Sequence, residues 1–156
     1  MEFDALALLY TIGCCLTSMI IAGKSANKEN KEWFENLKHP KNAFMLKYMN
    51  IIGFGFYLLF GYVLYQLIVS IDIVSIVLAV VIIQLMGLSP FLLYKTKKLK
   101  LFFFAMLVFP VLVPALVFFL IQANLALAII VMVYFLYLVY DMSYFYRLMK
   151  LNQHEE

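Results

Sequence analysis

Long runs without a charged residue constrain this chain more than any other feature of its sequence. Three of them, Ala5 to Gly23, Tyr48 to Ile71 and Ile73 to Tyr94, each match the about 20 residues that an apolar helix needs to cross a bilayer. A fourth, Leu101 to Tyr140, would extend about 60 Å as a helix at about 1.5 Å per residue, enough for two crossings. Its only polar break is Gln122-Ala123-Asn124, where we expect a tight turn.

These runs predict an all-α integral membrane protein, a bundle of five transmembrane helices in one membrane domain, residues 1–156. The expected spans lie near 4–23, 48–69, 73–94, 101–121 and 125–146, and the first loop is 24–47. Hydrophobic residues make up 66% and charged residues 13%, against roughly 45–50% and about 25% in ordinary globular domains. Glu2 and Asp4 stand where a secretory signal needs positive charge, so we expect the first span to stay in the mature protein.

The basic residues indicate an orientation. All 12 Lys and Arg fall in three stretches: 24–47, 95–100 and 147–150. Five spans would put these stretches on one face and leave the other with three acids and no base: Glu2, Asp4 and Asp72. Because Lys and Arg in short loops mark the cytoplasmic face, we predict the N-terminus outside and the C-terminus in the cytoplasm of a cell membrane. The net charge of +3 then concerns topology and anionic lipid, and no nucleic acid.

The first loop has the pattern of a short amphipathic helix. Asn30 is a candidate N-cap for a helix that runs through His39 and ends before Pro40. Two charge pairs are spaced i,i+4 along it, Lys28 with Glu32 and Lys31 with Glu35. Trp33 and Leu37 share a face, and we expect the helix to lie across the mouth of the bundle. Trp33 would then serve as the interfacial anchor that Trp commonly provides.

Small residues and prolines recur inside the expected spans. In the first span, Gly13 with Thr17 and Cys14 with Ser18 are spaced i,i+4, and the second span contains Gly53 and Gly55. They let helix backbones approach closely, so they predict helix packing or a homodimer contact. Pro110 and Pro114 should bend the fourth span. The bend would either widen an internal cavity or follow the curvature of a neighbouring helix.

One face of the last span is polar. Tyr134, Tyr137, Asp141 and Tyr144 fall at i, i+3, i+7 and i+10. Phenol and carboxyl groups in hydrocarbon need partners, so this face should point into the bundle or a cavity. Asp141 is the only acid clearly inside a span, and two interpretations stay open for it. It lines a pocket, or it reaches headgroup water, since Arg147 is only about 9 Å further along the helix.

The remaining polar residues do not specify chemistry. Gln84, the deepest polar side chain of the third span, would bond a neighbouring helix more often than a ligand. His39 and His154 are the two histidines and lie outside the spans, so we predict no metal site. The sequence has no Ser/His/Asp set, no glycine-rich phosphate loop and no paired buried carboxylates. We therefore assign no catalytic residue and lean against an enzyme.

Two short motifs carry a family resemblance. The first loop reads Trp33-Phe34-x-x-Leu37-x-x-Pro40, and the last span reads Tyr134-Phe135-Leu136-Tyr137. With the five spans, they resemble the TspO/MBR family, the tryptophan-rich sensory proteins that include the mitochondrial translocator protein. The family's motifs are Trp-Tyr-x-x-Leu-x-x-Pro and Pro-Tyr-x-x-Trp, and the resemblance covers nearly the whole chain.

The resemblance implies a tight five-helix bundle, often dimeric, with an apolar pocket beneath the first loop that takes porphyrins, sterol-like molecules and synthetic ligands. The residues that match the pocket by position are Ser18, Trp33, Phe34, Pro40, Gln84, Phe91, Tyr137 and Asp141. Tyr134 and Tyr144 join them as candidate ligand-binding residues because they share the polar face of the last span. Val139, Tyr144 and Arg147 also fit a loose sterol-contact pattern.

The chain departs from the family at several positions. It has one Trp, reads Asn42-Ala43-Phe44-Met45 where the family has Trp-x-Pro-Pro, and has Tyr137 in place of the last-span Trp. Some bacterial members degrade porphyrins in light through pocket tryptophans, so the missing tryptophans put that activity in doubt. Asp141 stands where the family has a small alanine, which predicts a ligand with a polar or cationic group instead of a bare sterol.

The sequence thus predicts a membrane receptor that binds an amphipathic small molecule, porphyrin, haem or sterol-like, in the bundle core beneath the first loop. It would require no cofactor, and its expected partners are the lipid bilayer, the hydrophobic ligand and a second copy of the chain. One alternative is an accessory membrane subunit without a ligand pocket. Another is a small transporter, for which more intramembrane charge would be expected.

Overall fold

The computed structural model describes residues 4–41 and 48–153, and these residues form seven α-helices. In chain order they are α1 (Ala5–Ser25), α2 (Lys28–Glu35), α3 (Met49–Ser70), α4 (Ile73–Thr96), α5 (Leu99–Met106), α6 (Phe109–Ala123) and α7 (Leu125–Leu151). Several residues named in the sequence analysis lie outside the described residues: Glu2, Asn42 to Lys47, and His154.

Five helical stretches are long and apolar enough to cross a membrane, in agreement with the predicted number. They are Ala5–Ser25, Ile51–Ser70, Ile73–Thr96, Leu99–Ala123 and Leu125–Leu151. The fourth stretch consists of α5 and α6. Leu6, Ile51 and Val111 illustrate the outer surface, since they are 79%, 70% and 68% exposed. Such a surface is unfavourable in water and compatible with lipid, so the protein is an all-α, multi-pass membrane protein.

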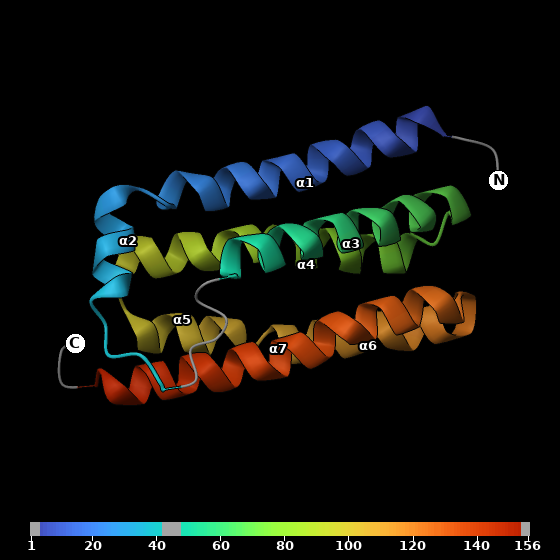
Figure 1. Ribbon diagram of the computed structural model, residues 1–156. Helices are drawn as coiled ribbons and strands as arrows, with labels where there is room; N and C mark the ends of the chain where they lie inside the picture. Colours follow the sequence, from blue (N-terminus) through green and yellow to red (C-terminus); the bar gives the residue numbers. More distant parts are fainter. Residues whose placement is uncertain (1–3, 42–47, 154–156) are drawn as a thin grey trace.

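The long helices run side by side, and α2 lies across one end of the bundle (Figure 1). α7 finishes at the α2 end, whereas α1 begins at the opposite end (Figure 1). The described basic residues lie in and after α2 and at or just beyond the C-terminal ends of α1, α4 and α7, so they gather at the α2 end. The opposite end carries Asp4 and Asp72, whose carboxylates cap α1 and α4 by accepting backbone N–H groups.

The predicted turn between the last two spans is a single residue. α6 ends at Ala123 and α7 begins at Leu125, so Asn124 ends one helix and caps the next. Its side-chain oxygen accepts from the backbone N–H groups of Ala126 and Leu127, at 3.1 and 3.3 Å. An Asn at this position satisfies donors that the start of a helix leaves unpaired, which hydrocarbon could not do.

The loop helix α2 begins and ends earlier than predicted. Asn27, not Asn30, is the N-cap, because its side-chain oxygen accepts from the backbone N–H of Asn30 at 2.8 Å. The helix ends at Glu35, four residues before His39. After it, the Phe34 carbonyl accepts from the Leu37 N–H at 3.2 Å and lies 2.9 Å from the His39 ring nitrogen Nε2, while Nδ1 of His39 lies 2.8 Å from the Tyr144 hydroxyl of α7. One of the two predicted ion pairs, Lys28 with Glu32, is confirmed, since the Lys28 ammonium lies 3.7 Å from the Glu32 carboxylate.

Of the two prolines in the fourth span, Pro110 follows directly after a break in the helix. α5 ends at Met106, and Leu107 and Val108 connect it to α6. Pro110 has no N–H for the Met106 carbonyl, and its ring would collide with that carbonyl in a straight helix. α6 continues through Pro114. Met106, the last residue before the break, lines the cavity described below, which relates the bend to the first of the two alternatives, an internal cavity.

The glycine packed most tightly against another helix is one that the sequence patterns did not single out. A Cβ atom on Gly87 of α4 would overlap the backbone oxygen and the hydroxyl of Ser18 in α1. By contrast, a Cβ on Gly13, Gly53 or Gly55 would meet no side chain and no atom of another helix within 4 Å among the described residues. The predicted close packing at these three glycines is therefore absent within the described chain, and Gly87 is where a small residue is required.

Candidate small-molecule cavity

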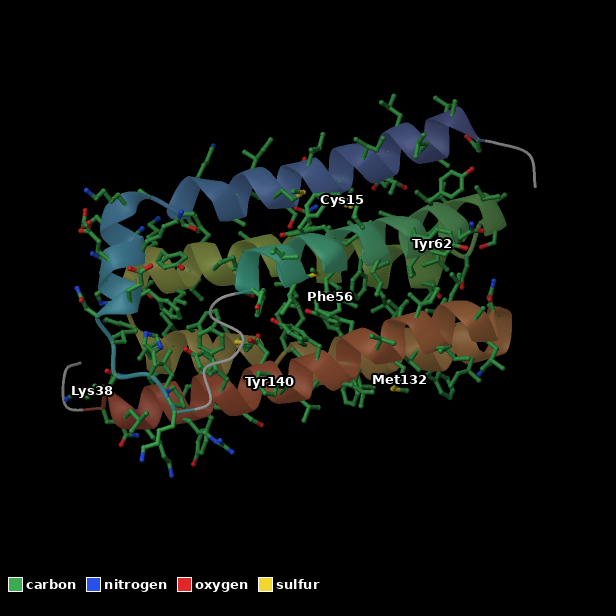
Figure 2. The ribbon with its side chains drawn as sticks, viewed as in Figure 1. Cys15, Lys38, Phe56, Tyr62, Met132 and Tyr140 are labelled. Atoms are coloured by element: carbon green, nitrogen blue, oxygen red, sulfur yellow. The ribbon has the colours of Figure 1, made fainter. Side chains whose placement is uncertain are left out.

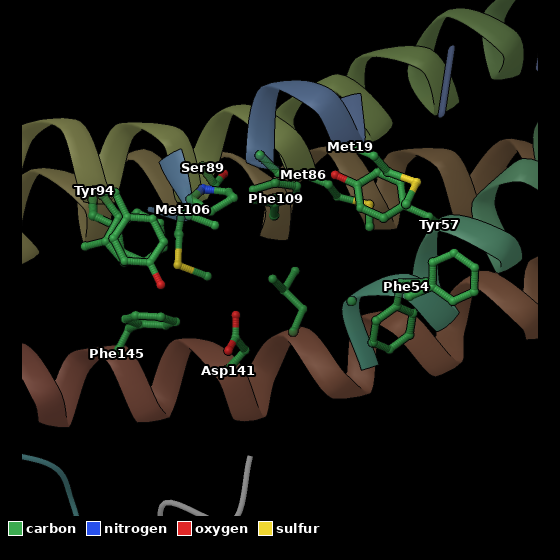
Figure 3. A pocket seen from close by; sticks show the side chains of 18 of the residues that line it. Met19, Phe54, Tyr57, Met86, Ser89, Tyr94, Met106, Phe109, Asp141 and Phe145 are labelled. Atoms are coloured by element: carbon green, nitrogen blue, oxygen red, sulfur yellow. The ribbon is translucent and has the colours of Figure 1, made fainter. Parts of the chain in front are cut away.

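A cavity of about 370 Å³ lies within the bundle near its α2 end, and all seven helices contribute to its wall. This volume falls in the range of about 300–1,000 Å³ typical of small-molecule sites. Figure 3 shows the space between α7 and the helices opposite, with Tyr94, Met106 and Asp141 around it. Most of the exposed wall is apolar, as expected for a site that takes a hydrophobic ligand.

Three of the four residues on the predicted polar face of the last span line this cavity. They are Tyr134, Tyr137 and Asp141. The two tyrosine rings are held by Phe56 of α3, whose ring centroid lies 4.8 Å from that of Tyr134 and 4.6 Å from that of Tyr137. Figure 2 shows Phe56 between α3 and α7. The face therefore points into the bundle, as predicted.

The fourth member of that face, Tyr144, has a different role. Its hydroxyl lies 2.8 Å from Nδ1 of His39, outside the cavity wall. His39 is thereby held at both ring nitrogens, since Nε2 contacts the Phe34 carbonyl. Tyr144 thus fixes the end of the first loop against α7 and does not line the cavity.

Asp141 lies in the wall about half-buried, and its carboxyl is directed into the open space (Figure 3). Among the described residues it has no hydrogen bond or ion pair. Of the two interpretations of Asp141, this position corresponds to pocket lining. Because unpaired carboxylates in an apolar wall are costly, the group calls for a polar partner from outside the chain.

The first loop contributes to the cavity through Phe34 instead of Trp33. Phe34 is buried and lines the wall, together with the exposed side chain of Lys31. Trp33 lies behind this layer, with its ring 6.3 Å from that of Phe34 and 6.5 Å from that of Tyr94. Pro40 is half-buried and does not line the cavity. The indole is therefore one side chain away from any molecule in the cavity.

The three remaining predicted site residues lie outside the wall, and two of them join helices. The Ser18 hydroxyl donates to the Ile83 carbonyl and lies 3.0 Å from the Tyr57 hydroxyl. Gln84 donates its side-chain amide to the Cys14 carbonyl at 3.0 Å, which is the helix–helix bond expected of a lone amide. Phe91 lies beneath Lys95, whose ammonium is 5.5 Å from the ring centroid.

Several wall residues were missed by the sequence analysis. Met19, Met86 and Met106 come from three different helices, so no local pattern connects them. Pro90 could have been found, because a proline inside an apolar run marks a carbonyl without its helical partner. That carbonyl belongs to Met86, a residue of the wall, just as the carbonyl freed by Pro110 belongs to Met106.

Besides the contact of His39 with Tyr144, two further contacts hold the loop over the cavity. The Lys97 ammonium lies 2.7 Å from the Glu29 carboxylate and joins α2 to the end of α4. This hydrogen bond and the positive charge lower the pKa of Glu29 below its usual value. At the other side, the buried side chain of Asn152 accepts from the Lys38 N–H at 2.9 Å and donates to the Lys38 carbonyl at 3.1 Å. α2 and the residues that follow it as far as His39 are hereafter called the cover of the cavity.

No protein-family model matches the chain, and no curated protein or solved structure matches it either. Within the part of the chain that the structure describes, no three His, Cys, Asp or Glu side chains come together as a metal site would require. The cavity is therefore interpreted from its own residues.

Proposed function

We propose that this protein is a membrane receptor that binds an amphipathic small molecule in the bundle cavity beneath α2. The observation that carries the proposal is the cavity of about 370 Å³, whose apolar wall includes one carboxyl and several hydroxyl groups. Such a combination binds the apolar body of a ligand and orients its polar end. The ligand classes suggested by the TspO/MBR resemblance are porphyrins, haem and sterol-like molecules.

The TspO/MBR resemblance itself remains part of this proposal. It is supported by five apolar spans, by a loop helix that covers the bundle, and by Phe34 and Tyr137 from the two motifs in one cavity wall. The basic residues gathered at the α2 end support a cytoplasmic position for that end, with the N-terminus outside, in a cell membrane. A homodimer would use one of the lipid-facing helix surfaces.

The alternatives differ in what they require of the cavity. An accessory subunit would bind another protein through its outer faces and would not need a cavity with a carboxyl group. A small transporter would need a path through the bundle. α2 lies across the bundle at this end, and the bonds between Asn152 and Lys38 hold the loop there, which supports a binding site over a path through the bundle.

The test is binding of protoporphyrin to the purified protein, followed by quenching of Trp33, the single tryptophan. We expect saturable quenching, because Trp33 packs on Phe34 of the wall. Gly53→Leu would place a side chain at the wall, where nothing lies within 4 Å of the new Cβ, and should weaken binding by about tenfold or more.

Gly55→Leu is the matched control, since it makes the same change on the same helix at an exposed position outside the wall. It should leave binding unchanged. Equal quenching in wild type and both variants would mean that protoporphyrin partitions into the detergent, and the accessory-subunit alternative would then be favoured.

A further inference from the structure

The strongest unexplained feature of the cavity is a carboxyl group that no described residue pairs with. Asp141 projects from α7 toward Met106, with Tyr94 and Phe145 on one side of it and Tyr57 on the other (Figure 3). A charged group in such a place is stabilised only by an opposite charge or by strong donors.

Aromatic rings surround the part of the cavity into which this carboxyl projects. They belong to Phe34, Tyr94, Phe102, Phe109 and Phe145, which come from α2, α4, α5, α6 and α7. Four of these rings are connected: the Phe34 ring centroid lies 6.2 Å from that of Tyr94 and 6.5 Å from that of Phe145, and the Phe145 centroid lies 4.6 Å from that of Phe102. The faces of such rings carry negative potential and attract cations.

The other polar groups of the wall also favour a cationic ligand. The carbonyls of Met86 and Met106 lack the helical donors that Pro90 and Pro110 cannot supply, so each can accept a hydrogen bond. Lys31 is the only base among the described residues of the wall, and its side chain is exposed at the α2 end. Its charge is solvated there, whereas Asp141 lies deeper in the bundle.

We infer that the ligand of this cavity is an amphipathic organic cation, an ammonium group on a compact apolar ring body. The inference rests on the proposed function and narrows its ligand class. The ammonium pairs with Asp141 and donates to free acceptors, and the ring body lies against the aromatic and methionine side chains. Porphyrins bear carboxylates, which Asp141 would repel, so they are expected to bind more weakly than such an amine.

The experiment uses three probes that share one ring body and differ in charge. They are 1-pyrenemethylamine, 1-pyrenemethanol and 1-pyrenecarboxylate, and binding to the purified full-length chain is followed by energy transfer from Trp33 to pyrene. We expect the amine to bind about tenfold or more tighter than the alcohol, and the carboxylate to bind weakest. In Asp141→Asn the ratio of amine to alcohol affinity should fall to about one.

Asp72→Asn is the matched control, because Asp72 caps α4 at the opposite end of the bundle and Asn also caps helices. It should keep the wild-type preference for the amine. If Asp141→Asn does not fold, the three wild-type affinities still decide, since an alcohol or carboxylate that binds as tightly as the amine overturns the inference.

The inference and the proposed function fail in different ways. If energy transfer saturates and Gly53→Leu abolishes it, but the amine is not preferred, the inference of a cationic ligand is overturned and the proposal of binding in the cavity stands. An amine preference that persists unchanged in Asp141→Asn also overturns the assignment to Asp141. Transfer that does not saturate for any probe, or that Gly53→Leu leaves unchanged, overturns both.

Discussion

Replacing Gly87 with Ala should loosen α1 from the rest of the bundle. The added methyl group would overlap the backbone oxygen and the hydroxyl of Ser18, and backbone cannot swing away as a flexible side chain can. α1 packs mainly on α4, so a displacement at this point affects its principal contact. The hydrogen bond from Ser18 to the Ile83 carbonyl lies at the same place and would be stretched or lost.

The expected loss of stability is about 2 kcal/mol. An added methylene in a filled interior costs about 1–3 kcal/mol, and a buried polar group that loses its partner costs about 1–3 kcal/mol. Ala gains up to about 1 kcal/mol over Gly in helix propensity, which offsets part of this cost. A net 2 kcal/mol would lower the ratio of folded to unfolded protein by a factor of about 30.

The assay is unfolding in mixed micelles, titrated with sodium dodecyl sulfate and followed by circular dichroism. Two glycines of α3 are controls. At Gly61 a Cβ would sit 3.4 Å from the Cys15 sulfur, an ordinary contact, and Gly55 is open. Ala at either position should therefore not destabilise the protein, and it should gain up to about 1 kcal/mol through helix propensity. If Gly87→Ala were as stable as these two, close backbone approach would not hold α1 on α4.

Two further predictions concern the cover and the orientation. Asn152→Ala should destabilise the protein by about 1–3 kcal/mol, because Asn152 is 2% exposed and its side chain bonds the Lys38 N–H and both the Lys38 and Leu148 carbonyls. The neighbouring exposed Gln153→Ala should change nothing measurable in the same unfolding titration. With Cys14 and Cys15 replaced by Ala, a membrane-impermeant thiol reagent should label Ser70→Cys in intact cells and spare Lys98→Cys. The opposite labelling would reverse the predicted orientation.

The number of spans and the turn at Asn124 followed from the sequence because hydrocarbon imposes its requirements locally. A crossing helix needs a certain apolar length, and a chain that turns needs a residue able to cap what the turn leaves open. The inward direction of Tyr134, Tyr137 and Asp141 followed for the same reason, since polar groups on one helical face avoid lipid.

The composition of the cavity could not be predicted in this way. α3 and α4 are apolar on all sides, so no stripe of polar residues indicates which of their faces meets another helix. The family resemblance implied that Ser18 and Gln84 line a pocket, but their partners are the carbonyls of Ile83 and Cys14, as the residue-based interpretation of Gln84 predicted. Only the packing of α1 against α4 decides that these polar groups are already satisfied by the protein.

In the first loop, too, the sequence determined the helix, whereas tertiary packing decided which of two adjacent residues lines the cavity. The sequence determined that a short amphipathic helix follows α1, but the choice between Trp33 and Phe34 as the cavity residue depended on how that helix is rotated. The rotation is fixed by contacts with distant parts of the chain: Glu29 with Lys97, His39 with Tyr144, and Lys38 with Asn152. Apolar length and caps are encoded within one segment, whereas the wall of a cavity is a property of several segments packed together.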